Sequence, residues 1–89
     1  MKFETPKTKK YYVIEMANSA ENRPDYLQIL DGGIVKWIEI RTGSNFIAQQ
    51  EIALSQATQF DSEAKAKKAI QGIFGKKYKY RITCHYKYE

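Results

Sequence analysis

The chain has 89 residues and carries 15 Lys and Arg against 10 Asp and Glu, which gives a formal net charge of +5. This length fits one small domain, and a domain of this size buries only about 60–65% of its unfolded surface. So thin a core leaves little room for an elaborate catalytic cavity. The hydrophobic content of 43% and the aromatic content of 13% are too high for intrinsic disorder, so the composition predicts a globular fold.

The cysteine and hydropathy patterns exclude several classes of protein. Cys84 is the single cysteine, which excludes an internal disulfide and any zinc site built on cysteine pairs. The N-terminus has no apolar stretch typical of a signal peptide, and no apolar run approaches the ~20 residues that span a membrane. We therefore expect a cytoplasmic protein that makes no membrane contact and needs no cofactor.

The charge is distributed unevenly along the chain. Residues 1–10 carry a net charge of +3, residues 11–63 a net −5 and residues 64–89 a net +7. Such polarity favours a charged partner, which is a nucleic acid, a nucleoprotein or an acidic protein surface. The alternative is that the lysines only keep the surface of the protein in solution.

The N-terminal segment predicts an arm followed by a strand. Residues 1–9 are polar and are expected to form a flexible basic arm, which leaves residues 10–89 as the single domain. Residues 10–17 are rich in aromatic and β-branched side chains, which predicts a strand. Residues 18–25 are dense in turn-forming residues and predict a loop.

A β-hairpin is the clearest local signal in the middle of the chain. Residues 26–30 and 34–40 are strand-like and flank Asp31-Gly32-Gly33, where glycine accepts the positive φ that a tight turn requires. Residues 46–54 show neither clean alternation nor a clean helical stripe, and we interpret them as a third strand of the meander.

A well-marked helix follows over residues 62–74. Asp61 or Ser62 can cap its N-terminus, and Gly75 stands where a helix commonly ends. An apolar stripe at helical spacing predicts which side of this helix is buried. The stripe consists of Ala66, Ala69, Ile70, Ile73 and Phe74.

The last segment alternates perfectly from Tyr78 to Tyr88. Every even position is Tyr, Ile or Cys, whereas the odd positions are Lys79, Arg81, Thr83, His85 and Lys87. This period of two predicts a long strand with its even face packed under the helix and its odd face in solvent. The sequence thus predicts an α+β domain, an antiparallel β-sheet of about four strands with one main α-helix on one face, the helix preceding the last strand.

The sequence predicts no enzyme. Cys84 and His85 are neighbours, so on a strand they point to opposite faces and cannot form a catalytic dyad. The clusters of His and Cys that ligate metals are missing, as are the glycine-rich motifs that bind phosphate.

The basic residues of the C-terminal third are the candidate binding site for a partner or for nucleic acid. Phosphates bind such surfaces with release of counterions, and exposed tyrosines can stack on bases. Reversal of Lys79 and Arg81 to glutamate is expected to impair binding with little effect on stability, because both are expected to be exposed. If the even face of the strand packs under the helix, the helical and strand cations lie on opposite sides of the sheet. The candidates are Lys65, Lys67, Lys68, Lys76, Lys77, Lys79, Arg81, His85 and Lys87.

The stretch Ala57-Thr-Gln-Phe-Asp-Ser-Glu-Ala-Lys-Ala-Lys-Lys-Ala-Ile, followed by a glycine and a terminal strand, resembles a pattern found in small accessory proteins of Gram-positive phages and mobile elements. The resemblance covers residues 10–16 and 57–84, and the Asp31-Gly32-Gly33 hairpin has no counterpart in it. The resemblance implies a compact protein that acts by binding a partner. Anti-defence inhibitors, including anti-CRISPR proteins, are the most specialised members of this class. The resemblance implies no catalytic residue.

Two hypotheses for function follow. In the first, the chain is a non-enzymatic inhibitor or regulator that binds a host protein or nucleoprotein through its polarised surface. In the alternative, it is a direct nucleic-acid-binding module that uses the C-terminal basic helix and strand. Salt separates them, because phosphate binding weakens steeply with salt and a protein interface with apolar anchors weakens less.

Overall fold

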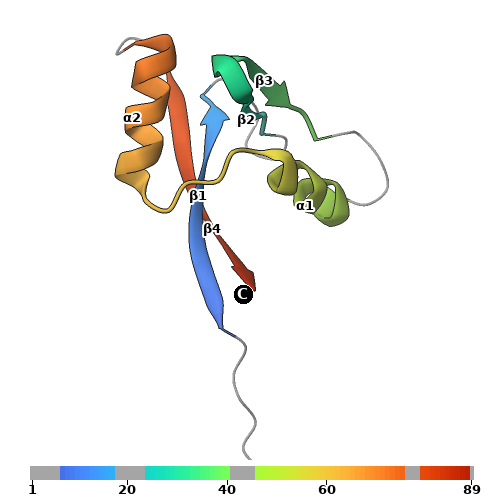
Figure 1. Ribbon diagram of the computed structural model, residues 1–89. Helices are drawn as coiled ribbons and strands as arrows, with labels where there is room; N and C mark the ends of the chain where they lie inside the picture. Colours follow the sequence, from blue (N-terminus) through green and yellow to red (C-terminus); the bar gives the residue numbers. More distant parts are fainter. Residues whose placement is uncertain (1–6, 18–23, 41–45, 76–78, 89) are drawn as a thin grey trace, which may run out of the picture.

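The strand-forming segments pair into a four-stranded antiparallel sheet with the order β3-β2-β1-β4 (Figure 1). A computed structural model describes residues 7–17, 24–40, 46–75 and 79–88 of the chain. The α+β class is confirmed, although two helices are present where one main helix was predicted. The strands are β1 (Thr8–Met16), β2 (Tyr26–Ile29), β3 (Val35–Ile38) and β4 (Tyr80–Tyr88), and the helices are α1 (Phe46–Gln56) and α2 (Glu63–Phe74).

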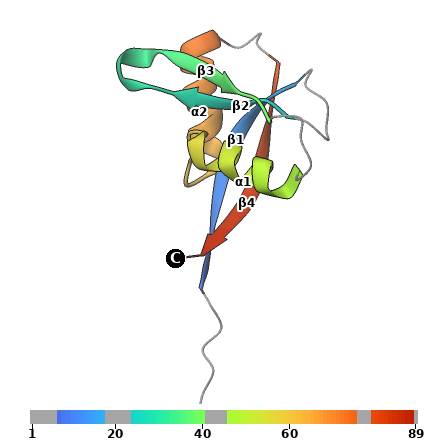
Figure 2. The ribbon, with the colours of Figure 1, turned by 90° about the vertical axis from the view of Figure 1, so that its right-hand side faces the viewer.

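Strands β1 and β4 form a long two-stranded ribbon. Their register is continuous over nine pairs, from Thr8 opposite Tyr88 to Met16 opposite Tyr80. Figures 1 and 2 both show the N-terminal end of β1 and the C-terminal end of β4 running past the two helices. Because β1 begins at Thr8, it takes in the last two residues of the segment that was expected to be an arm.

The predicted hairpin is confirmed, with shorter arms than the sequence suggested. Strands β2 and β3 pair from Tyr26 opposite Ile38 to Ile29 opposite Val35, and a short 3₁₀ turn over Asp31–Gly33 joins them. Gly32 and Gly33 both have φ near +81°, a conformation in which a side chain would be strained. The two glycines are therefore what lets the chain reverse here.

The prediction of a strand over residues 46–54 is wrong, because this segment is the start of helix α1. Its side chains are mostly good helix formers, such as Gln, Glu, Ala and Leu. The helical stripe is hidden in the sequence because α1 buries only Ala53 and Leu54 while Ile47 and Ile52 stay exposed. Apolar residues on both sides of a helix cancel the periodic signal.

Helix α2 has the caps that its sequence predicted. The Ser62 hydroxyl accepts a hydrogen bond from the Lys65 amide at 3.2 Å. At the other end, the Gly75 amide donates to the Gln71 carbonyl at 2.9 Å, and Gly75 has φ of +81°. Ala66 and Ile70 of the predicted stripe are buried.

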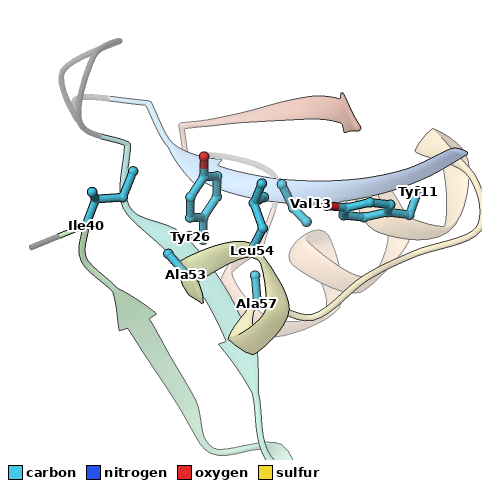
Figure 3. Packing of buried hydrophobic residues seen from close by; sticks show 7 residues of the cluster. All are labelled: Tyr11, Val13, Tyr26, Ile40, Ala53, Leu54 and Ala57. Carbon is cyan, nitrogen blue, oxygen red and sulfur yellow. The ribbon is translucent and has the colours of Figure 1, made fainter. Parts of the chain in front are cut away.

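The two helices cover opposite faces of the sheet. Odd residues of β1 point toward α1, where they form one buried cluster that Figure 3 shows from close by. Even residues point toward α2, where Ile14 packs with Leu27, Ala66 and Ile70. The expectation of one covered face is thus corrected. The α1-side cluster consists of Tyr11, Val13, Tyr26, Ile40, Ala53, Leu54 and Ala57.

The segment between the helices fills a gap between β1 and β2, which pair at Glu15 and Tyr26. The Thr58 amide donates to the Leu27 carbonyl at 3.0 Å, and the Thr58 hydroxyl accepts from the Ile29 amide at 2.7 Å. Phe60 and Tyr12 exchange two backbone hydrogen bonds of 2.9 Å. This segment therefore joins the splayed β2–β3 hairpin to β1.

Ile70→Asp is expected to unfold the domain, because Ile70 is fully buried and the substitution places an unpaired charge in the core. A small domain has only about 5–15 kcal/mol of stability to lose. Ile73→Asp on the same helix is the matched control, since Ile73 is 37% exposed and its substitution should shift the melting temperature only slightly. Thermal melts followed by circular dichroism compare the two, and equal melting temperatures would contradict this packing of α2.

Candidate functional site

The helical lysines of the predicted site lie on the outer side of α2. Lys65, Lys67 and Lys68 are all exposed there. The Lys65 ammonium lies 3.5 Å from a carboxylate oxygen of Asp61 in an exposed pair. Lys79 is also exposed, whereas residues 76 and 77, the remaining predicted lysines, lie outside the described part of the chain.

Arg81 is half-buried on the face of the sheet that α1 covers, so the expectation that it faces solvent is wrong. Its guanidinium lies 3.4 Å from a carboxylate oxygen of Glu15 and donates to the Ala17 carbonyl at 3.0 Å. Only 6% of Glu15 is exposed, so this carboxylate depends on the arginine for charge compensation. Arg81 is therefore the half-buried partner of a buried carboxylate and not a freely solvated cation.

His85 is also half-buried on this face and is not a solvated member of a basic row. Its ring lies 5.7 Å from the Tyr11 ring and 6.3 Å from the Tyr26 ring, and its Nε2 is 2.9 Å from the Thr83 hydroxyl. Burial lowers the pKa of His85 below the usual 6.5, and the Glu15 carboxylate only partly opposes this shift. At neutral pH the imidazole is uncharged and packs as an aromatic ring.

The structure thus divides the predicted site. The α2 lysines lie on one side of the sheet, while Arg81, His85 and Lys87 point to the other, because the even face of β4 packs under α2. The sequence predicted this separation of the helical and strand cations for the case in which the even face of the strand packs under the helix. The seven candidates that lie in the described part of the chain do not form one continuous surface.

A different cluster forms where the β1–β4 ribbon runs past the helices, and we call it the ribbon end: residues 7–12 and 84–88. On the α2 side of the ribbon end, 62% of Tyr86 and 77% of Tyr88 are exposed. The reason is the pairing of Phe60 with Tyr12, after which α2 runs away from the ribbon end. Tyr80 and Ile82 pack against α2, whereas no helix in the described part of the chain covers the later even residues.

One lysine lies beside these exposed tyrosines, and further lysines lie at the same end of the ribbon, with Lys9 and Lys87 on its opposite face. The Lys10 ammonium lies 6.0 Å from the centre of the Tyr86 ring, on the opposite strand. The Lys87 ammonium lies 5.5 Å from the Tyr11 ring and 2.8 Å from the Gln59 side-chain oxygen. Lys7 and Lys9 are also exposed at this end, and Lys9 makes an exposed ion pair of 3.7 Å with Asp61.

Sequence reasoning missed the β1 lysines as site residues. The signal was present, because residues 1–10 carry a net +3 and the last strand ends in alternating Tyr and Lys. What was missing is the register that places Lys9 opposite Lys87 and Lys10 opposite Tyr86. Pairing of the two ends of the chain is a long-range property that local patterns do not predict.

A hollow of about 700 Å³ opens between α1 and the ribbon end, and the outer edge of β4, Tyr86 and Tyr88 included, forms part of its lining. Tyr11, His85 and Lys87 line its ribbon side, and Gln50 and Glu51 line its helix side. Burial and the nearby Glu51 carboxylate both raise the pKa of the Tyr11 hydroxyl, so it remains protonated at neutral pH. The hollow therefore presents both a cation and an anion, with no excess of either.

Arg81→Glu is expected to destabilise the domain by about 3 kcal/mol or more, because it places a second carboxylate beside the buried Glu15. Lys79→Glu is the control, since exposed charges contribute only about 0–1 kcal/mol. Urea unfolding of both single variants measures the difference. Equal stabilities would show that Glu15 does not depend on Arg81.

Within the described residues, no helix is long and apolar enough to cross a membrane, and no three His, Cys, Asp or Glu side chains gather as metal ligands. Comparison of the chain with protein-family models, curated proteins and solved structures found no match in any of the three.

Proposed function

We propose that this protein is a non-enzymatic binding protein that holds single-stranded nucleic acid on the α2 side of the ribbon end. The observation that carries the proposal is the exposure of Tyr86 and Tyr88 beside Lys10 of β1. Large aromatic side chains normally lie in the core of so small a domain. Two exposed tyrosines on one strand face are therefore a surface with apolar area available to a ligand.

The spacing of the two tyrosines suits successive bases. Residues two apart on a strand lie about 6.6–6.8 Å from each other on the same face. An extended single strand can place one base on each ring, and base–aromatic stacking tolerates any sequence because every base has a π-face. The proposal is therefore sequence-tolerant binding of an unpaired strand.

Phosphates beside the stacked bases would meet Lys10, whereas Lys9 and Lys87 would act from the opposite face of the ribbon. Lys10 reaches over the Tyr86 ring, and Lys7 and Lys9 precede it on β1. Lys87 stands between the two tyrosines in sequence and points to the other face, beside Tyr11. Each phosphate that these lysines neutralise releases counterions, so binding should weaken with rising salt.

The double variant Tyr86→Ala/Tyr88→Ala is expected to weaken binding of labelled oligo-dT and oligo-U by about tenfold or more, because stacking contributes about 1–3 kcal/mol per base. Fluorescence anisotropy at two salt concentrations measures the affinity. Both side chains are exposed, so the melting temperature should stay close to that of the wild type.

Lys67→Ala/Lys68→Ala is the matched control for this experiment. These lysines lie on the outer side of α2, away from the ribbon end, and should change affinity much less than the tyrosine pair. Equal losses in both double variants would indicate unspecific electrostatic binding. Unchanged affinity in the tyrosine variant would refute the proposal.

A protein partner is the second candidate function, which corresponds to an inhibitor or regulator of a host protein or nucleoprotein. The observation that favours it is helix α1, where 70% of Ile47 and 52% of Ile52 are exposed. Large exposed apolar side chains are common in protein contacts. Tyr86 and Tyr88 point to the opposite face of the sheet, although both residues line the hollow beside α1 together with Ile47.

Ile47→Lys/Ile52→Lys is expected to abolish capture of a partner from nuclease-treated host lysate and to leave oligonucleotide affinity nearly unchanged. The tyrosine variant should show the reverse pattern, in which oligonucleotide affinity falls and capture of a protein partner is unchanged. Pull-down and anisotropy on the same preparations separate the two functions. A partner that the lysine-substituted protein still captures with full recovery would exclude α1 as the contact.

A further inference from the structure

Strand β4 forms one edge of the sheet, and nothing pairs with its outer side within the described residues. It is nine residues long, contains no proline and keeps a one-to-one register with β1 over its whole length. Edge strands of this length present a row of unpaired backbone donors and acceptors unless a bulge, a proline or another segment interrupts them. The β4 edge lacks the first two of these interruptions.

The backbone of Tyr12 shows which residues of β4 point outward. Its N–H and C=O both bond to Phe60, and the Met16 N–H bonds to the Asp25 carbonyl, so the even residues of β1 face away from β4. Backbone groups alternate along a strand, and therefore the odd residues of β1 bond to β4. Each odd β1 residue lies opposite an odd β4 residue, such as Tyr11 opposite His85. The N–H and C=O groups of Ile82, Cys84, Tyr86 and Tyr88 consequently point outward.

We propose that β4 pairs antiparallel with β4 of a second copy of this chain, with His85 opposite His85 of the second copy, so that the two sheets become one. In this register Cys84 lies opposite Tyr86 of the second copy, and Ile82 lies opposite Tyr88. Both are pairs of outward-pointing residues, as the hydrogen bonds of an antiparallel ladder require. The inference is independent of the proposed function.

Charge and the length of the paired segment together favour this register, because centring on Ile82 or Tyr86 would pair only five residues of each strand. Centring the pair on Cys84 would place Arg81 opposite Lys87 of the second copy, and centring it on Thr83 would place Lys79 opposite Lys87. Like charges directly opposite each other destabilise a strand pair. Centring on His85 places Lys87 opposite Thr83, pairs seven residues of each strand and leaves no cations face to face.

Strand pairing at the edge leaves both faces of the sheet accessible. On the α2 side, Tyr88 would lie beside Ile82 of the second copy and Tyr86 beside its Cys84. The exposed tyrosines of the two copies would then form one continuous surface, flanked by Lys10 from each copy. Contacts between aromatic and aliphatic side chains across strands add to the stability of such a pair.

Sedimentation of the full chain without nucleic acid tests the pairing. We expect wild-type protein to approach twice the monomer mass of 10.4 kDa as concentration rises through the micromolar range. Cys84→Pro removes an outward N–H from each copy and leaves the β1–β4 bonds in place, so it should weaken the dimer by about tenfold or more. Cys84→Ala keeps the N–H and should dimerise like the wild type, which also shows that no disulfide is needed.

Oxidation tests the register and needs no proline variant. In Tyr86→Cys the new thiol lies opposite Cys84 of the second copy, at about 5.5 Å between Cα atoms, which is within disulfide range. We expect this variant to form covalent dimers on mild oxidation. Wild-type protein should not, because its two Cys84 residues would be diagonal neighbours about 7–8 Å apart.

The outcomes are distinct from those for nucleic-acid binding, because both experiments omit nucleic acid. A wild-type protein that stays monomeric at every concentration, with no covalent dimer from Tyr86→Cys, would overturn the pairing. Covalent dimers of the wild type through Cys84 would overturn the His85-centred register. A dimer that Cys84→Pro leaves intact, in a variant that melts like the wild type, would place the interface elsewhere.

Discussion

The arrangement of this domain depends on the backbone hydrogen bonds that residues 57–60 make to two strands at once. Strand β2 diverges from β1 after Tyr26, and the facing backbone groups of both strands would be left without partners in a buried position. Thr58 bonds to β2 and Phe60 bonds to β1, so the segment closes the sheet where the strands separate. The same four residues join α1 to α2 and cross the sheet between them. The two helices therefore lie on opposite faces.

This crossing also determines which part of the β1–β4 ribbon remains exposed. Phe60 bonds to Tyr12, and α2 then runs toward Tyr80 and the far end of the ribbon. Even residues of β4 are consequently covered near Tyr80 and exposed at Tyr86 and Tyr88, although the sequence repeats the same pattern throughout. One periodic strand thus contributes to the core at one end and remains exposed at the other. The two ends of β4 differ in exposure because α2 begins beside the middle of the ribbon and covers only the end near Tyr80.

The elements with strong local signals could be predicted from the sequence, namely the α2 caps, the hairpin glycines and the alternation of β4. Helix α1 could not, because Ile47 and Ile52 are exposed and obscure its buried side. Arg81 and His85 were misplaced because a solvated odd face requires that nothing cover it, whereas Arg81 bonds to Glu15 and His85 packs against the Tyr11 and Tyr26 rings. Alternation shows which side chains share a face, but it carries no information about how far along a strand that face is buried. The lysines of β1 could not be assigned to the candidate site from the sequence, because only the long-range pairing of β1 with β4 places them there.

The ribbon end offers two kinds of contact that point in perpendicular directions. Side chains stand above and below the sheet, so stacking on Tyr86 and Tyr88 uses the face, whereas backbone groups of the same residues lie in the plane and use the edge. Binding of a nucleic-acid strand and pairing of two copies therefore do not compete for the same atoms. Pairing would place the tyrosines of both copies on one face and would lengthen the surface available to an extended ligand. A strand long enough to span it would hold both copies together, because each copy's contacts raise the effective concentration of the other.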